Sequence, residues 1–166
     1  MEIRRIRADE WQELRALRLR ALLDAPDAFG ATYEQESSDP EQAWRDWAIS
    51  ASAGEHHYIA VVDDGNAWGG MAMGSRWPED PEPAHVYAMW VEPGRRGAGL
   101  GTALVGSVLA WAREAGAHAI ELRVTETNVA GIRLYGRCGF APTGERSPLR
   151  EGSDVTTATM SREVWS

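Results

Sequence analysis

The glycine-rich segment at residues 97–101 constrains this chain more than any other feature, because it joins a strand pattern to a helix pattern. The apolar run at residues 86–91 predicts a strand that leads into the segment. Apolar residues then recur at helical spacing and predict a helix that begins near Gly99 and buries one face: Leu100, Leu104, Val108 and Trp111.

The loop between strand and helix predicts an anion site. Its glycines stand at alternate positions, Gly97, Gly99 and Gly101, and Arg95 and Arg96 precede them. Such a loop leaves several backbone N–H groups unpaired at the positive end of the helix dipole. A tight turn alone needs one glycine, whereas close approach of a phosphate to the backbone requires that side chains be absent. We therefore interpret the loop as a phosphate site.

The spacing of the loop discriminates between phosphate ligands. A dinucleotide-binding loop requires a third glycine, but this chain has Thr102 at that position counting from Gly97. A nucleoside-triphosphate loop requires a lysine, and the chain contains none, since all 17 of its basic residues are arginine. The pattern Arg96-x-x-Gly99-x-Gly101 instead resembles the pyrophosphate loop of the GNAT superfamily of acyl-CoA-dependent N-acetyltransferases.

A second motif extends the resemblance: Asn128-x-Ala130-x-x-x-Leu134-Tyr135-x-x-x-Gly139-Phe140. The resemblance covers residues from about 85 to 140 and implies a single-domain α/β GNAT-like fold over residues 1–166. The implied fold is a mixed central β-sheet flanked by about four helices. The implied activity is acetyl transfer from acetyl-CoA to a primary amine by direct attack in a ternary complex. The residues implied for acetyl-CoA binding are Met89, Trp90, Val91, Arg96, Gly97, Ala98, Gly99, Leu100, Gly101, Thr102, Asn128 and Tyr135.

Two residues of the second motif have alternative interpretations. Tyr135 matches the family tyrosine that protonates the departing thiolate, a task that suits a phenol because it is neutral at pH 7 and donates one hydrogen bond. Alternatively, Tyr135 only packs against its helix neighbours. Asn128 binds the pantetheine amides, caps its own helix, or does both.

The general base has more than one candidate. His85 lies on the strand before the loop and, by the strand period of two, would share a face with Tyr87 and Met89. Several GNAT enzymes place Glu or His at this strand position. Glu121 on the adjacent strand is the rival, although it could simply pair with Arg123, and Glu126 is a third candidate.

The rest of the chain alternates helix and strand patterns. A helix capped by Asp9 should end before Pro26, a second should start at residues 39–40, and a short third should run over 128–138. Strands are expected at 2–7, 58–62, 67–76, 118–124, 140–145 and 155–162. Residues 24–33 fit neither a helix pattern nor a strand pattern. The alternation predicts one α/β layered structure with a mixed sheet.

Composition limits the class of protein. The 166 residues fit one domain, no stretch is apolar for long enough to span a bilayer, and the amino terminus does not resemble a signal peptide. A lone cysteine, Cys138, fits a cytoplasmic protein. The net charge is −8, which argues against nucleic acid as a partner. The adjacent His56 and His57 point to opposite faces of an extended chain, so no metal site is expected.

The sequence says least about the site that binds the acceptor amine. The resemblance implies that it includes the segment between the first two helices, residues 24–38, which has no basic residue and four acids: Asp24, Asp27, Glu34 and Glu36. These acids predict a cationic amine, a small molecule or a peptide, unless the segment is only a solvated acidic loop.

Two other functions stay open. One is an acyltransferase with another acyl donor or an alcohol acceptor, and the other is a non-catalytic acyl-CoA-binding regulator. No membrane partner is expected, and a homodimer is left open.

Overall fold

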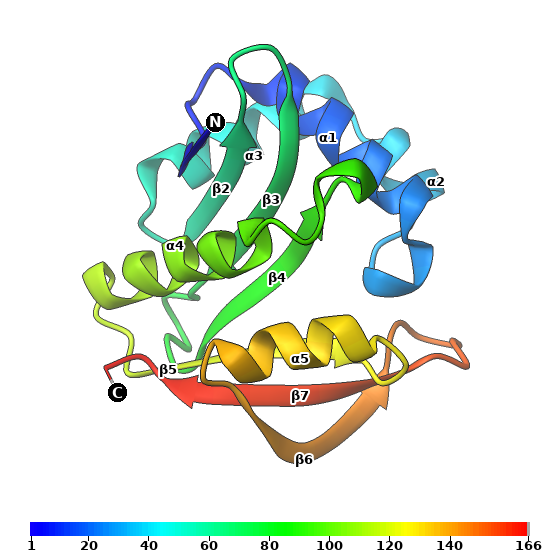
Figure 1. The fold of residues 1–166 in the computed structure, drawn as a ribbon. Helices are drawn as coiled ribbons and strands as arrows, with labels where there is room; N and C mark the ends of the chain where they lie inside the picture. Colours follow the sequence, from blue (N-terminus) through cyan, green and yellow to red (C-terminus); the bar gives the residue numbers. More distant parts are fainter. Residues whose placement is uncertain (166) are drawn as a thin grey trace.

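Seven strands form one mixed sheet in the order β1-β2-β3-β4-β5-β7-β6 (Figure 1). The computed structural model describes residues 1–165. Strands β4 and β5 are parallel, and the other neighbouring strands are antiparallel. The strands are β1 (Glu2–Arg5), β2 (His57–Asp63), β3 (Trp68–Ser75), β4 (Ala84–Val91), β5 (Ala119–Thr125), β6 (Ala141–Pro148) and β7 (Thr156–Glu163).

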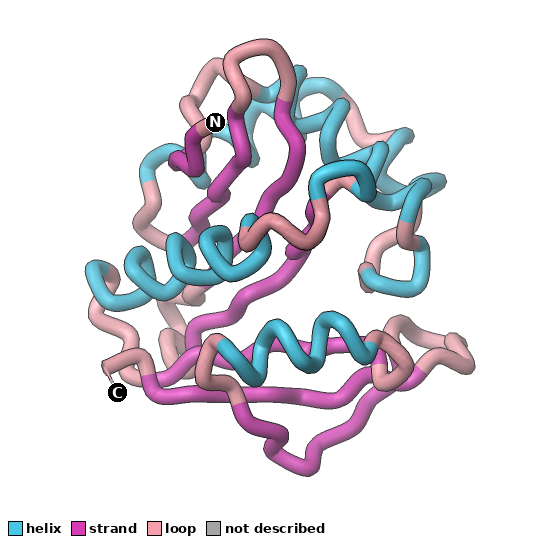
Figure 2. The backbone as a smooth tube through the Cα atoms, in the orientation of Figure 1, coloured by secondary structure: helices cyan, strands magenta, loops and turns pink. Residues whose placement is uncertain are grey.

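Helices cover both faces of the sheet (Figure 2). The described residues form α1 (Trp11–Asp24), α2 (Tyr33–Ser37), α3 (Glu41–Ala53), α4 (Leu100–Glu114) and α5 (Val129–Arg137), with short 3₁₀ turns η1 (Pro26–Ala28) and η2 (Pro93–Arg95). Helices α1 and α3 lie on one face, and α4 and α5 lie on the other. The predicted fold class is confirmed. The additional helix is α2, which begins with a capping box between Thr32 and Gln35 that sequence reasoning missed.

Two hydrophobic clusters fill the space between the sheet and its helices. The cluster under α4 includes Val108, Trp111 and Ile120, and the cluster under α1 and α3 includes Trp44 and Met73. Close packing of α4 depends on Gly74 of β3, because a Cβ atom there would lie 2.6 Å from the Trp111 ring. The sheet is therefore buried on both sides over β2 and β3, and β4 contributes residues to both clusters.

The first helix begins differently from the prediction. Glu10, not Asp9, is the N-cap residue, and its side chain makes no capping hydrogen bond within the helix. Its carboxylate instead accepts the backbone N–H of Arg7 at 2.7 Å and faces the side chain of Arg4. The ion pair with Arg4 outweighs the local preference of Asp9 for the capping position, and the opening strand ends at Arg5.

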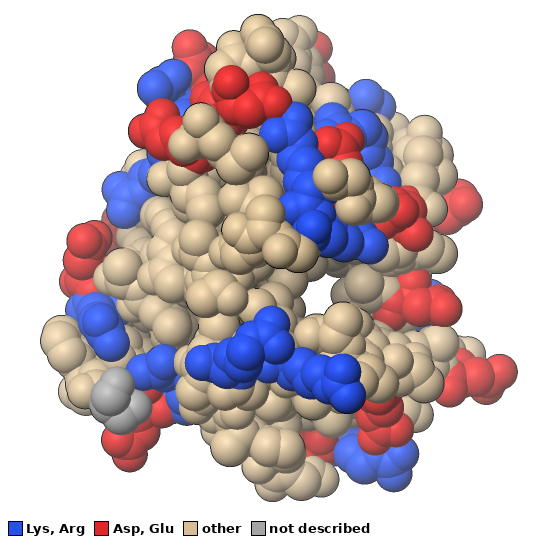
Figure 3. Space-filling model, in the orientation of Figure 1, with Lys and Arg blue, Asp and Glu red and all other residues tan. Residues whose placement is uncertain are grey.

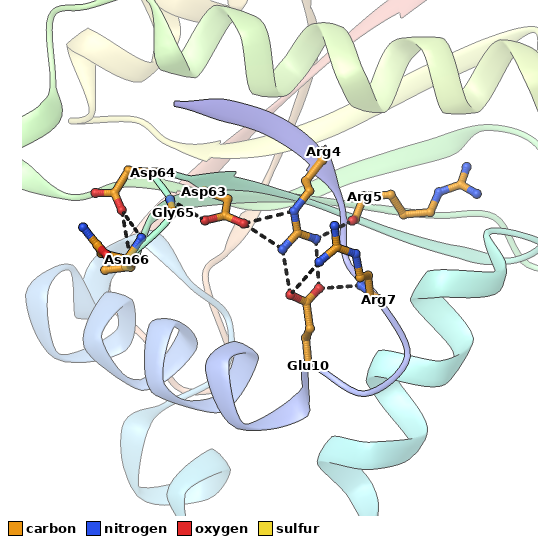
Figure 4. Close-up of polar contacts among 9 residues, drawn as sticks. Arg4, Arg5, Arg7, Glu10, Asp63, Asp64, Gly65 and Asn66 are labelled. Atoms are coloured by element: carbon orange, nitrogen blue, oxygen red, sulfur yellow. Dashed lines mark hydrogen bonds and ion pairs between the residues drawn. The ribbon is translucent and has the colours of Figure 1, made fainter.

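Arg4 ties the start of the chain to the β2–β3 hairpin (Figure 4). Its guanidinium lies 2.6 Å from the Glu10 carboxylate and 2.9 Å from that of Asp63, and its side chain is only 10% exposed. Burial by itself would raise the pKa of Glu10, but hydrogen bonds from Arg4 and from the Arg7 amide lower it below its ordinary value of 4.5.

We expect Arg4→Ala to lose about 1–3 kcal/mol of unfolding free energy at pH 7, because two partly buried carboxylates lose their cation. A lowered folded-state pKa adds stability that is present above 4.5 and is lost as the pH falls through the folded value. Urea unfolding should therefore show wild type and variant converging on acidification.

The matched control is Arg7→Ala, because the Arg7 side chain is 68% exposed and lies 4.0 Å from Glu10. It should change the stability by less than about 0.5 kcal/mol. Equal losses in the two variants, or a gap that acid leaves unchanged, would contradict this account of Arg4.

Candidate active site

The parallel strands β4 and β5 pair only where they begin. The paired residues are Ala84 with Ile120 and His85 with Glu121, and beyond them the strands separate (Figure 2). A cavity of about 670 Å³ lies there. It is lined by the end of α1 and η1, the second half of β4, the loop after it, the first turn of α4, and one side of α5 along its length. Figure 3 shows an opening through this part of the molecule with arginine atoms on both sides. Among the described residues, no strand pairs with the edge of β4 that faces the cavity.

A β-bulge at Ala88 shapes the strand at this point. Ala88 has a φ of 52°, a left-handed conformation that costs a non-glycine residue about 1–2 kcal/mol. The extra residue changes the alternation of the strand, because Tyr87 and Ala88 both pack on the α1–α3 side whereas Met89 packs on the α4 side. The prediction that His85 shares a face with Met89 is therefore wrong.

The loop after β4 presents free backbone amides to the cavity. Gly97 and Gly99 have φ values of 84° and 83°, and Gly99 is the N-cap residue of α4. Within residues 1–165, the N–H groups of residues 97–102 donate no hydrogen bond, and the first bond at the start of α4 is donated by Ala103. A Cβ atom on Gly97 or Gly99 would meet no described atom within 4 Å, so glycine leaves open space beside these amides. The loop can bind an anion through its backbone.

Both arginines of the loop have partners within the protein. Arg95 donates a hydrogen bond to Asp64 at 2.5 Å, and Arg96 donates one to Asp24 at 3.0 Å. The same oxygen of Asp24 accepts the indole N–H of Trp90 at 3.0 Å. These contacts hold the end of α1 against β4. The loop therefore offers an anion mainly its free amides, with the guanidinium groups already engaged.

Helix α5 forms the opposite wall of the cavity. Asn128 accepts the backbone N–H of Gly131 at 3.0 Å, so it caps α5, and it also lines the cavity. The first turn of α4 packs closely against α5, since a Cβ atom on Gly101 would lie 3.0 Å from the side chain of Leu134. The walls thus combine polar helix ends with apolar side chains.

Most of the residues predicted to bind acetyl-CoA lie together around this cavity. Those that line it are Met89, Trp90, Val91, Arg96, Gly97, Gly99, Leu100, Gly101, Thr102 and Asn128. Ala98 and Tyr135 are not part of the lining. Sequence reasoning missed Ala130, Leu134 and Arg137, although these recur at helical spacing in the second motif and could have been found from it.

Tyr135 is a core residue beside the cavity. It is 8% exposed and packs edge-on against Phe140, with ring centroids 6.1 Å apart. Burial raises the pKa of its hydroxyl well above the ordinary value of 10. The ring is therefore held by packing, and the hydroxyl stays protonated across the physiological range.

The two main base candidates contact each other. His85 Nδ1 lies 3.7 Å from a carboxylate oxygen of Glu121, and both side chains are partly exposed, at 37% and 29%. Glu121 does not pair with Arg123, which instead donates a hydrogen bond to Ser147. Glu126 forms an ion pair with Arg146 that lowers the pKa of its carboxyl group. His85 and Glu121 lie where β4 and β5 begin to separate and are not part of the cavity lining.

The described residues contain neither a metal-binding cluster nor a membrane-spanning helix. Over residues 1–165, no group of three His, Cys, Asp or Glu side chains could hold a metal ion. No helix in that range has the length and apolar character needed to cross a membrane.

Sequence comparisons agree with this geometry. The model of the acetyltransferase (GNAT) family matches residues 9–140. A mycothiol acetyltransferase of Beutenbergia cavernae is 31% identical over 129 residues, which cover 76% of this chain and 40% of that protein. A streptothricin acetyltransferase of Streptomyces lavendulae is 35% identical over 109 residues, 65% of this chain and 56% of that protein. The chain thus spans about half, or less, of the length of these curated relatives.

Solved structures share the fold. YncA from Salmonella typhimurium, a putative acetyltransferase with its cofactor acetyl-CoA, has a TM-score of 0.78 at 20% identity and is matched over 100% of this chain and 95% of its own. The PaiA N-acetyltransferase of Thermoplasma acidophilum, in complex with coenzyme A, has a TM-score of 0.73 at 13% identity, with 98% of each chain covered. With the family model matching residues 9–140 around the cleft between β4 and β5, this chain belongs to the GNAT acetyltransferase family.

Proposed function

We propose that residues 1–166 form one N-acetyltransferase domain that transfers an acetyl group from acetyl-CoA to a primary amine by direct attack in a ternary complex. The observation that carries the proposal is that the unpaired edge of β4 and the free amides of residues 97–102 line the same cavity. When bound, acetyl-CoA supplies the acetyl group as an activated thioester.

The cavity walls fit the parts of such a donor. Free amides at a helix N-terminus bind the diphosphate group without any lysine. The unpaired edge of β4 offers backbone donors and acceptors to the amides of the pantetheine arm. Side chains of Met89, Leu100 and Leu134 suit its aliphatic carbons. A backbone N–H near Met89 would polarise the thioester carbonyl, a role that makes no demand on side-chain identity.

His85 is proposed as the general base. An alkylammonium ion has a pKa of roughly 10, so the acceptor must lose a proton before it attacks. The His85 imidazole accepts that proton, and Glu121, 3.7 Å away, stabilises the imidazolium that forms. The pair stands at the point where β4 and β5 separate.

Tyr135 is proposed as the proton donor for the departing sulfur. Its raised pKa keeps the proton on the hydroxyl at every pH at which the base is active. Helix α5 carries Tyr135 and also lines the cavity through Leu134. The contact with Phe140 fixes the ring.

The acceptor is proposed to be a cationic amine. Asp24 and Glu36 are bound to Arg96 and Arg18, so the segment before α3 attracts cations less strongly than its four acids suggest. Asp27 lines the cavity and, within the described residues, forms no ion pair. Relatives named for mycothiol and for streptothricin indicate that acceptors differ widely within the family.

With acetyl-CoA present, the protein should acetylate cationic primary amines such as polyamines faster than acidic amines such as free glutamate. The preference should weaken at high salt, because screening reduces the attraction of the Asp27 region. Release of the CoA thiol measures the rates. Turnover of alcohols alone would contradict the amine assignment. Tight binding of acetyl-CoA with no turnover of any acceptor would favour the non-catalytic regulator.

Variants should separate the acid from the base. Tyr135→Phe keeps the ring contact and should lower kcat on the order of 10²-fold at all pH values, with unchanged acetyl-CoA affinity. His85→Ala should lose most activity near neutral pH and recover as alkaline buffer deprotonates the amine. Glu121→Gln should lower the activity near neutral pH by less than His85→Ala does. If Glu121→Gln gives the pH-dependent loss and His85→Ala does not, Glu121 is the base.

A further inference from the structure

Two arginines of α5 are left without partners. The chain has 17 arginines, and nearly all bind carboxylates, backbone carbonyls or aromatic rings. Among residues 1–165, the guanidinium groups of Arg133 and Arg137 form no hydrogen bond, ion pair or ring contact, and both side chains are exposed. Like charges four residues apart on a helix destabilise it slightly, although Arg137, in the last turn of α5, also complements the helix dipole.

The pair lies beside the cavity. Ala130, Leu134 and Arg137 recur along one stripe of α5 and all line the cavity wall, and Arg133 stands one turn before Arg137. Helix α5 therefore presents one of its two free cations directly to the cavity. In Figure 3, arginine atoms form a continuous patch along one side of the opening, across from a second patch.

The same end of α5 packs against the amide loop. The side chain of Thr102 lies near the thiol of Cys138, the residue after Arg137, and acts to lower its pKa. A Cβ atom on Gly101 would lie 3.0 Å from Leu134, so the last turn of α5 contacts the first turn of α4. The free guanidinium groups therefore lie next to the free amides of residues 97–102 but on a different element.

These observations separate two anion sites. The loop amides carry only partial charges, and Arg95 and Arg96 are engaged by Asp64 and Asp24. A phosphomonoester carries nearly two negative charges and pairs with arginine through bidentate hydrogen bonds. We infer that Arg133 and Arg137 bind the phosphomonoester on the nucleotide end of the acyl donor, separately from the loop that binds its diphosphate. This inference rests on the proposed function, and it names the pair as the determinant that selects a donor with this extra phosphate.

Calorimetric titration with CoA and with 3′-dephospho-CoA tests the inference. At low ionic strength the wild-type protein should bind CoA about three- to tenfold more tightly, as expected for an exposed charge-assisted contact. The double variant Arg133→Gln/Arg137→Gln should bind dephospho-CoA as the wild type does but lose the preference for CoA. Arg45→Gln removes one charge from α3, where Arg45 pairs with Glu41, and should keep the preference.

The outcomes distinguish the inference from the function on which it rests. The inference would be overturned if the wild-type protein bound CoA and dephospho-CoA with equal affinity, or if the double variant kept the preference for CoA. It would also be overturned if the double variant lost affinity for both ligands equally. A wild-type protein that binds neither ligand would instead contradict the proposed function.

Discussion

The separation of β4 from β5 after two paired residues is the constraint on which the rest of the site depends. The left-handed Ala88 turns β4 at this point, and the strand keeps its neighbour on the β3 side only. The segment after α1 then bridges the gap. Asp24 accepts hydrogen bonds from the β4 side, and Thr125 of β5 donates one to the carbonyl of Asp27 at 2.6 Å. The gap between β4 and β5 thus forms a cavity, and the segment after α1 closes its far side.

In the proposed complex, the glycine loop would meet the diphosphate mainly with backbone amides rather than with charged side chains. The protein has a net charge of −8, and the two arginines of the glycine loop serve to fasten the loop to Asp64 and Asp24. The anion-binding capacity then lies in the unbonded amides of residues 97–102, which need no counter-ion when the site is empty. Within residues 1–165, the guanidinium groups without a partner, those of Arg133 and Arg137, lie on α5, where both side chains are exposed to water.

Local patterns predicted the parts of the molecule whose structure is locally determined. The strand, glycine loop and helix around residues 84–114 follow from apolar spacing and from glycines that adopt left-handed φ values. The sequence could not show that Ala88 would adopt such a φ, because tertiary packing imposes it, and so the face of His85 relative to Met89 was predicted wrongly. The same limit applies to long-range pairs: that Glu121 meets His85 rather than Arg123 depends on strand register. That Arg95 and Arg96 are engaged depends on α1 and the β2–β3 turn.

The central claim is that the amides beside Gly99 bind the diphosphate of acetyl-CoA, and ligand-induced stabilisation of paired variants tests it most directly. Gly99→Glu places a carboxylate in the open space beside the amides, whereas Gly106→Glu places one on the exposed side of the same helix, where nothing lies within 4 Å. At a ligand concentration of 100 Kd, acetyl-CoA should stabilise the wild-type protein and Gly106→Glu by about 2.7 kcal/mol. Gly99→Glu should melt as a folded protein and show no such response. A full response in Gly99→Glu would contradict the account.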